Sequence, residues 1–389
     1  MNENKNKIII TVAIIAVIAV AVGGFVVFGN STKTAEKNTN TVATNKSSST
    51  TTTTNATNTT TSIDTTNTKN VNITSGGTYN LSGEYESVTI NTNQEVKLNL
   101  NNAQITNSNG PAINVLEADT VTIELTGSNK ITSTTTEDLD GAVYSKGDLV
   151  FTGTGSLEVK SNYDGIVSKD TLVIKNGTYT ITSDDDAIRG KDSVEIQDGT
   201  FTINAGGDGI KASNDEDTSK GTVTISGGKF DITAKSDGIQ AITNATITGG
   251  TINISGAEGI EATYIKIDNG TINISASDDG INASKKSTIS TPTVEINGGN
   301  ITIKMGQGDT DGIDANGNIY VNGGTIDITG NSAFDYDGTA QHNGGTIIVN
   351  GTQTDTITGQ MMGGGMRGGM QGQMPQGGEM PTGGMKGMR

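Results

Sequence analysis

The chain contains no cysteine and no tryptophan, one histidine (His342) and only four prolines among its 389 residues. The absence of cysteine excludes disulfides and thiolate metal sites. The scarcity of proline excludes collagen and a polyproline stalk. A Ser-His-Asp catalytic set would have to use His342. Aromatic residues make up 4% of the chain, so aromatic platforms for sugar rings can be few.

Basic residues are also in deficit, and the formal net charge is −17. The excess of acid lies in residues 71–359. Such a body repels the phosphate backbone, so nucleic acid is excluded as a partner. Strong acidity suits either bound cations or simple solubility, and composition leaves both readings open.

What is present begins with an apolar segment at residues 8–28, long enough to span a bilayer as a helix. Lys5 and Lys7 precede it, and no basic residue follows until Lys33. The positive-inside rule then places the N-terminus in the cytoplasm and the rest of the chain outside. We therefore expect residues 1–29 to anchor the protein in the cytoplasmic membrane at the cell surface. A cleaved signal peptide and a secreted protein remain the alternative.

Three further segments follow from composition. Residues 30–70 are dominated by Thr, Ser and Asn and are expected to form a disordered stalk. Residues 71–359 alternate apolar and polar positions and are expected to form the folded domain. Residues 360–389 are rich in Gly, Met and Gln, show no apolar period, and are expected to form a disordered tail.

The folded segment is a repeat of about 22 residues. Each unit carries an acidic-Gly-Ile element, an alternating strand, a turn ending in Gly, and a second alternating strand, as in SDDDAIRGKDSVEIQDGTFTINAG at 183–206. The acidic marker recurs from Asp140 through Asp164, Asp186 and Asp208 to Asp337. The acidic-Gly-Ile element supplies a third, short strand beside the two alternating ones. Three strands in each unit predict an all-β, right-handed parallel β-helix, a solenoid in which each unit forms one coil. Longer spacings come from insertions at 214–220 and 285–293, which we expect to be loops.

The alternation predicts which side chains form the core. Val194, Ile196, Phe201 and Ile203 occupy inward positions of one unit, and the same places hold β-branched or aromatic residues in later units. The Ile of each acidic-Gly-Ile element adds a third inward column. Glycines such as Gly199 would supply the positive φ at the corners. Residues 71–135 fit the period poorly and are expected to be irregular first coils that cover the N-terminal end.

The acidic markers are expected to stack in one column, one coil apart. Stacked carboxylates repel one another unless they are neutralised. Either each side chain accepts backbone N–H groups of its own Gly turn, or some of them bind Ca²⁺, which takes six to eight oxygen ligands. We expect one calcium site within 258–314 and a second between Asp184 and Asp208. The candidate ligands are Asp184, Asp185, Asp186, Asp208, Asp237, Glu258, Glu261, Asp278, Asp279, Asp309, Asp311 and Asp314.

Arg189 and Lys211 follow the acidic markers of two successive coils. Calcium beside a Lys or Arg base is what β-elimination of a uronic acid polymer requires. A plain charge ladder that neutralises the acids is the simpler interpretation, so no catalytic residue is expected. Tyr163, Tyr264 and Lys211 are the candidates for contact with substrate.

The SDGI and DDGI elements, the TVTI-GG-TFTI strands and the Gly/Met/Gln-rich end resemble the bacterial carbohydrate-binding domain-containing β-helix family. Its clostridial cellulose- and polygalacturonate-binding surface proteins are similar in fold to family 9 pectate lyases. The resemblance covers residues 71–358 and implies a right-handed β-helix with bound Ca²⁺ that binds plant cell-wall polysaccharide. It also implies little or no lyase activity.

The sequence thus favours a non-catalytic, calcium-binding surface protein that binds polygalacturonate or cellulose. A calcium-dependent pectate lyase and a structural adhesin are the two alternatives. Depolymerisation of the glycan separates the first from the second, and the absence of any glycan binding would leave the third.

Overall fold

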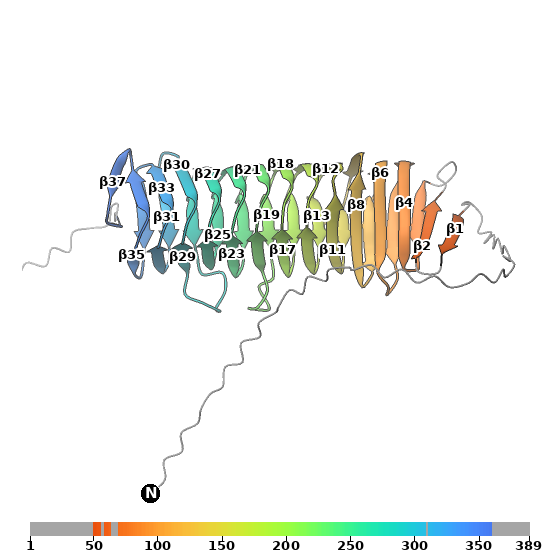
Figure 1. The fold of residues 1–389 in the computed structure, drawn as a ribbon, viewed down its shortest axis with the longest axis horizontal. Coiled ribbons are helices and arrows are strands. Elements are labelled where there is room, and N and C mark those ends of the chain that lie inside the picture. The colour runs from red at the N-terminus through yellow and green to blue at the C-terminus, as the bar shows by residue number, and fades with distance from the viewer. Residues whose placement is uncertain (1–49, 56–57, 64–68, 309, 360–389) are drawn as a thin grey trace, which may run out of the picture. The chain divides into compact units, whose positions relative to one another are not determined.

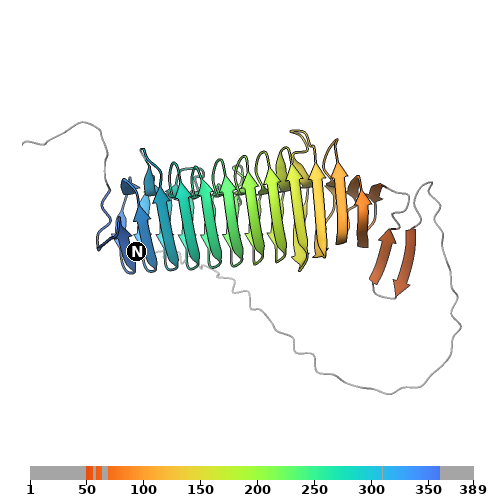
Figure 2. The same ribbon diagram turned by 90° about the horizontal axis from the view of Figure 1, so that it is seen from above.

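The computed structural model describes residues 50–55, 58–63, 69–308 and 310–359. Every regular element in these residues is a β-strand. Strands of successive coils lie side by side and pair in parallel (Figure 1, Figure 2). Ile188, Ile210 and Ile239 stand in register on three successive coils, 22 and 29 residues apart. The prediction of an all-β parallel solenoid is confirmed.

Each coil contributes one strand to each of three sheets. Sheet 1 is a separate 12-stranded sheet. It consists of β3 (Asn70–Ile73), β5 (Ser87–Asn91), β7 (Ile113–Glu117), β10 (Gly141–Ser145), β13 (Asp164–Ser168), β16 (Ile188–Gly190), β19 (Ile210–Ala212), β22 (Ile239–Ala241), β25 (Ile260–Ala262), β28 (Ile281–Ala283), β31 (Asp311–Ala315) and β34 (Ser332–Tyr336). The acidic-Gly-Ile elements lead into these strands or begin them.

Sheets 2 and 3 hold the two alternating strands of each repeat. Sheet 2 consists of β8 (Thr120–Thr126), β11 (Asp148–Gly153), β14 (Thr171–Ile174), β17 (Ser193–Ile196), β20 (Thr222–Ile225), β23 (Asn244–Ile247), β26 (Tyr264–Ile267), β29 (Thr293–Ile296), β32 (Asn318–Val321) and β35 (Ala340–His342). Sheet 3 consists of β9 (Ser128–Ser133), β12 (Ser156–Ser161), β15 (Thr178–Ser183), β18 (Thr200–Ala205), β21 (Lys229–Ala234), β24 (Thr251–Gly256), β27 (Thr271–Ala276), β30 (Asn300–Met305), β33 (Thr325–Thr329) and β36 (Thr346–Val349).

Sheets 2 and 3 join at the N-terminal end of the solenoid. β6 (Val96–Asn107) is long enough to pair with both β8 and β9, and β4 (Gly77–Tyr85) pairs along β6 with a register shift between Leu81 and Gly83. The expected irregular first coils are therefore present, and they continue the same stack. At the other end, β37 (Thr352–Thr354) folds back antiparallel onto β36.

The core is the column of inward side chains predicted from the alternation. Val194, Ile196, Phe201 and Ile203 are each at most 2% exposed, and the Ile that follows each acidic-Gly pair is fully buried. Aromatic rings also stack along the inside of sheet 3. The rings of Tyr179 and Phe201 are 4.9 Å apart between centroids, and those of Phe201 and Phe230 are 4.6 Å apart and nearly parallel.

The corner glycines have the predicted positive φ. Gly199 has a φ of 136°, and a Cβ there would lie 2.8 Å from the Phe201 ring. Only glycine meets both demands, because an L side chain is strained at this φ and lacks space.

The segment 30–70 differs in part from the prediction of a disordered stalk. β1 (Thr50–Asn55) and β2 (Asn58–Ile63) form an antiparallel hairpin, and β2 pairs in parallel with β4. Threonine is β-branched and suits a strand, and pairing uses only backbone groups. Composition alone could not reveal that an open sheet edge lies next to this stretch.

The anchor at 8–28, the tail at 360–389 and Asp309 lie outside the described residues. Within the described part, no helix has the length and hydrophobicity that a membrane span requires. The two insertions are loops between sheets 1 and 2, one between β19 and β20 and the other between β28 and β29, whose first residue is Thr293.

The aromatic stack gives a test of the core. Phe201→Ala should lower the free energy of unfolding by about 3–5 kcal/mol, because it removes a ring packed on both sides. The outward neighbour Thr202 is exposed, and Thr202→Ala should change stability by less than about 0.5 kcal/mol. Chemical denaturation of both variants measures the difference. Equal effects would show that Phe201 is not part of a tightly packed core.

Candidate functional site

A column of acidic side chains follows sheet 1, as the repeat predicted. Asp164, Asp186, Asp208 and Asp237 precede the buried Ile of their coils and are 2% to 7% exposed. The small residue between acid and Ile, which is Gly165, Ala187, Gly209 or Gly238, allows the coils to pack closely. At Gly209 an added Cβ would lie 2.6 Å from the carbonyl oxygen of Gly238 in the next coil. The acids are therefore carried into a crowded corner by the same element that buries the Ile.

Hydrogen bonds to these carboxylates run between coils. The backbone N–H of Asp186 donates to Oδ1 of Asp164 at 3.0 Å, that of Asp208 to Asp186 at 2.8 Å, and that of Asp237 to Asp208 at 2.9 Å. Asp311 donates in the same way to Asp279 at 3.0 Å. One of the two alternatives for the acids was that each accepts an N–H of its own Gly turn, and at these four acceptors the donor belongs instead to the next coil. The reason is that stacking brings the amide of the next coil closer.

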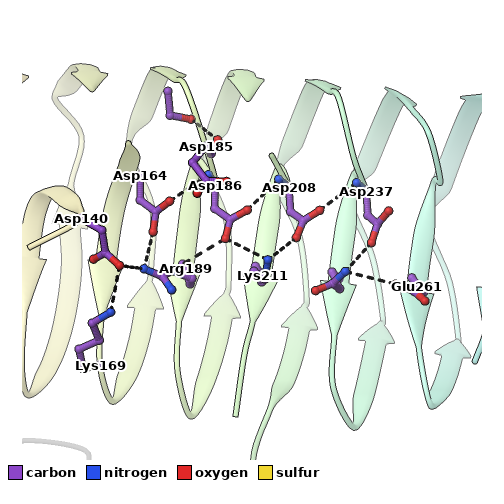
Figure 3. Close-up of polar contacts among 12 residues, drawn as sticks. Asp140, Asp164, Lys169, Asp185, Asp186, Arg189, Asp208, Lys211, Asp237 and Glu261 are labelled. Atoms are coloured by element: carbon purple, nitrogen blue, oxygen red, sulfur yellow. Dashed lines mark hydrogen bonds and ion pairs between the residues drawn. The ribbon is translucent and has the colours of Figure 1, made fainter. Parts of the chain in front are cut away.

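A second column, three residues after the acids, carries cations on two successive coils, after Tyr144 and Val167 on the two coils before them. Arg189 and Lys211 are in register on β16 and β19. Nη2 of Arg189 is 2.5 Å from Oδ2 of Asp164, and it also contacts the carboxylate of Asp140. Nζ of Lys211 is 2.7 Å from Asp208 and 3.2 Å from Asp186. Figure 3 shows these two cations reaching the row of carboxylates.

Asp140 does not belong to the column in which the sequence placed it. Gly141 is the residue in register with Asp164, so Asp140 lies one position earlier. Its carboxylate contacts Lys169 at 3.2 Å as well as Arg189. Asp140 thus joins the ion-pair network through Lys169 and Arg189 without being a member of the column.

Burial and charge act in opposite directions on this network. Burial raises the pKa of Asp164 to about 7, although the Arg189 guanidinium opposes the rise. Burial also raises the pKa of Asp186, against the pull of Lys211. Burial alone would lower the pKa of Lys211, but Asp186 and Asp208 together raise it. Lys211 therefore remains a protonated counter-ion at neutral pH.

The cations end at the next coil. Gln240 follows Lys211 in register, and Glu261 follows Gln240. Oxygens of Asp237, Glu258 and Glu261 all lie within 4.8 Å of one another. Nε2 of Gln240 donates to Asp237 at 2.6 Å and to Glu261 at 3.2 Å. Here three carboxylates converge where the column supplies an amide in place of a cation.

The second insertion provides one charge to this cluster. Nζ of Lys286 lies 2.5 Å from Oε2 of Glu261. Nδ2 of Asn282 donates to Oε1 of Glu258 at 3.2 Å. Among the described residues, the buried Oε2 of Glu258 and Oδ1 of Asn282 have no hydrogen-bond partner. The cluster therefore contains two oxygens without a hydrogen atom or cation to satisfy them.

These surroundings raise the pKa values of two of the three acids, Glu258 and Asp237. Burial, with Glu261 and Asp237, raises the pKa of Glu258 to about 8. Burial, with Asp208, raises the pKa of Asp237 to about 7. Burial would also raise the pKa of Glu261, but Lys286 and Ser284 lower it overall. If all three were ionised, they would carry more negative charge than Lys286 neutralises, and this repulsion contributes to the raised pKa values.

The other candidate ligands are distributed along the same side. Asp185 joins Asp164 and Asp186 in a second group of three convergent carboxylates, whereas Asp184 is exposed beside them. Further along, Asp278 is exposed and Asp279 and Asp311 share the bond described above. Burial, with Asp279 and Asp311, raises the pKa of Asp314 to about 7. The structure thus separates the predicted ligands into several groups along sheet 1.

The candidate substrate contacts do not form one site. Lys211 is on sheet 1 and is held by two carboxylates. Tyr163 directly precedes Asp164, the first residue of β13 in the same sheet. Tyr264 points outward from sheet 2, where its hydroxyl contacts Glu295. Sequence reasoning placed Asn282 one coil from Glu258 and Glu261 but missed Gln240 and Lys286. Aligning the coils by their Ile residues would have found Gln240, but no repeat position marks Lys286.

The ion-pair network gives a test with a pH dependence. Arg189→Met should lower stability by about 3–5 kcal/mol at pH 8, because it leaves buried carboxylates without a counter-ion. The native pKa of Asp164 is raised above its ordinary value, so the native state binds a proton as the pH falls through 7. The loss should therefore shrink between pH 8 and pH 5. Denaturation curves at both pH values measure it.

Lys169→Met is the matched control, because Lys169 is more exposed and forms its ion pair with the outer acid, Asp140, while its Nζ lies 5.5 Å from the centre of the Tyr144 ring. It should cost less than about 1 kcal/mol. A loss for Arg189→Met that stays constant from pH 5 to pH 8 would contradict the assignment of Asp164 as its partner.

Comparison with known proteins adds the family. A family model described as carbohydrate-binding domain-containing protein matches residues 67–312 and 258–371. Among solved structures, the polysaccharide lyase-like protein from C. thermocellum matches with 31% identity over 53% of this chain and 87% of that chain, at a TM-score of 0.47. No curated protein matches significantly. Because the family model covers more than half of the sequence, this chain belongs to the carbohydrate-binding domain-containing protein family.

Proposed function

We propose that this chain is a non-catalytic, calcium-dependent glycan-binding protein whose β-helix, residues 71–359, binds an acidic polysaccharide such as polygalacturonate. The family supports a polysaccharide partner. The calcium dependence is carried by one observation, the convergence of Asp237, Glu258 and Glu261 with a buried carboxylate oxygen of Glu258 left without a partner. We further propose that the coils wind right-handed, as parallel crossovers almost always do.

The donor set of this cluster fits Ca²⁺. Calcium takes six to eight oxygen ligands in a flexible arrangement and favours carboxylates and amide carbonyls. Asp237, Glu258 and Glu261 supply carboxylates, and Oδ1 of Asn282 is a further oxygen without a partner. When bound, the ion would neutralise the cluster and leave coordination positions for oxygens from outside the protein. Carboxylates of an acidic glycan could fill those positions.

The group around Asp185 and Asp186 fits a metal less well. Arg189 already contacts Asp164, and Lys211 already contacts Asp186. A divalent cation would have to displace two charged side chains here or sit beside both, whereas at Asp237, Glu258 and Glu261 it would meet one, Lys286. We therefore place the calcium site at Asp237, Glu258 and Glu261, and regard Asp184, Asp185, Asp186 and Asp208 as a region neutralised by the protein itself.

The same contacts argue against lyase chemistry. A base for β-elimination must be neutral when it removes the proton. Lys211 is paired with two buried carboxylates that raise its pKa. Arg189 is paired with Asp140 and Asp164. Both cations are engaged in holding the acidic column together, so we propose that they serve stability and not catalysis.

Charge also explains why an acidic glycan would need calcium. The protein has a formal net charge of −17 and would repel a polyuronate. A divalent ion held by protein carboxylates converts that repulsion into a bridge. We propose that the protein is displayed on the outer cell surface by the apolar segment 8–28, which would place the solenoid where such polymers occur.

Calcium binding can be measured by thermal unfolding of the full chain. Addition of Ca²⁺ at 100 times its dissociation constant should stabilise the protein by about 2.7 kcal/mol, because the ion binds the folded state. Glu258→Gln should remove most of the gain. Asp185→Asn, in the neutralised group, is the matched control and should retain it. Equal gains in wild type and Glu258→Gln would place the ion elsewhere.

Glycan binding is tested separately with polygalacturonate. Wild-type protein should be retained on the polymer in Ca²⁺ and released by EDTA, without the ultraviolet absorbance of unsaturated products. Glu258→Gln should reduce retention at least about tenfold, equivalent to about 1.4 kcal/mol. Absorbance that rises in Ca²⁺ and is lost in Lys211→Ala would instead identify a lyase. Absence of retention under all conditions would favour a structural adhesin.

A further inference from the structure

Two insertions interrupt the repeat at one corner of the solenoid, the corner between sheets 1 and 2. The acidic loop, residues 214–220, lies between β19 and β20, and the basic loop, residues 285–292, lies between β28 and β29. In sheet 1 only β22 and β25 separate β19 from β28, so the loops are three coils, or about 14 Å, apart along the solenoid. Both extend on the same side of it (Figure 1).

The two loops carry opposite charges. The acidic loop holds three exposed acids at residues 215–217 against one lysine. The basic loop holds Lys285 and Lys286 and no acid. Lys286 pairs with Glu261, whereas Lys285 is exposed. On a protein with a formal net charge of −17, the basic loop is a place that attracts an acidic surface.

The basic loop also presents an apolar side chain to solvent. Ile289, in the middle of this loop, is 50% exposed, more than any other large hydrophobic side chain among the described residues. A single exposed isoleucine needs no partner by itself. Beside an exposed lysine it adds an apolar contact to an electrostatic one, and this combination is typical of a surface that binds another protein.

Both loops are held in place by hydrogen bonds to the solenoid or within the loop. In the basic loop, the backbone N–H groups of Lys286 and Ser287 donate to Oγ1 of Thr263 at 3.1 Å and 2.8 Å. In the acidic loop, Oδ1 of the buried Asn214 accepts the N–H of Asp217 at 2.9 Å. An ordered loop loses little conformational entropy when a partner binds, so a small contact area can suffice.

We infer that this corner is the interface between two copies of the chain, in which the basic loop of each copy contacts the acidic loop of the other. A two-fold axis perpendicular to the solenoid and midway between the loops forms both contacts at once, because it exchanges the two positions. Lys285 then faces residues 215–217 of the other copy, and Ile289 becomes buried in the contact. The acidic remainder of the surface repels a second copy, so charge selects this corner. The inference goes beyond the proposed calcium and glycan binding and does not depend on them.

Sedimentation velocity of the full chain over a concentration series tests the dimer. A nonionic detergent keeps the apolar segment 8–28 in solution. Wild-type protein should show a monomer–dimer equilibrium that weakens as the salt concentration rises, because the contact is ionic. Lys285→Glu and Asp215→Lys should each raise the dimer dissociation constant at least about tenfold, because each places like charges opposite one another at both contacts. Ile289→Ser should raise it on the order of tenfold through lost apolar burial.

A mixture of two variants gives the sharpest test of the contact between the loops. When Lys285→Glu and Asp215→Lys proteins are mixed in equal amounts, dimers should form again. The reason is that both contacts of the mixed pair then join opposite charges. Lys229→Glu makes the same charge change at an exposed lysine on sheet 3 and is the matched control. It should leave the dissociation constant unchanged.

The outcomes decide the proposal in either direction. Dimers that are lost in each charge variant and recovered in the mixture support it. A wild type that is monomeric at every concentration overturns it, as does a dimer that neither charge variant weakens. A monomeric wild type that binds phosphatidylglycerol vesicles through Lys285 also overturns it and assigns the basic loop to a lipid surface. Measurements of calcium and polygalacturonate binding still decide the proposed function by themselves.

Discussion

The parallel hydrogen-bond ladder between coils is the constraint on which the rest of this structure depends. It places every residue directly beside its equivalent in the next repeat, about 4.8 Å away. Ile188, Ile210 and Ile239 therefore form one buried column. The same ladder brings the acidic residue of each repeat beside the next acid. Core packing and the concentration of negative charge have one cause.

The acids cannot move apart without breaking the ladder, so they must be neutralised where they stand. Backbone amides of the following coil contribute to this at Asp164, Asp186 and Asp208. Arg189 and Lys211 complete it in the first part of the column. Beyond Lys211 the register position changes to an amide and then to an acid. Three carboxylates converge there with one cation, Lys286, beside them, and our proposed calcium site follows from that change.

The proposed binding site depends on the residues that sheet 1 presents beside its buried isoleucines. Sheet 1 offers carboxylates in a buried corner, which suits a cation and, through it, an acidic polymer. A solenoid can carry such a site because each outward row varies without disturbing the inward one.

The sequence by itself determined the solenoid, its period, its core and its corner glycines. Those features are written as local alternation and recur in every repeat, as at Phe201 and Gly199, so that each unit confirms the others. It also located the acidic column from Asp164 to Asp311 but misplaced both ends, because Asp140 lies one position early and Ser332, not Asp337, is in register with Asp311. Only the tertiary structure decided which acids share a site. Glu258 meets Asp237 and Asn282 across coils, and Lys286 reaches Glu261 from an insertion. These contacts depend on inter-coil register and loop path, which local periodicity does not encode.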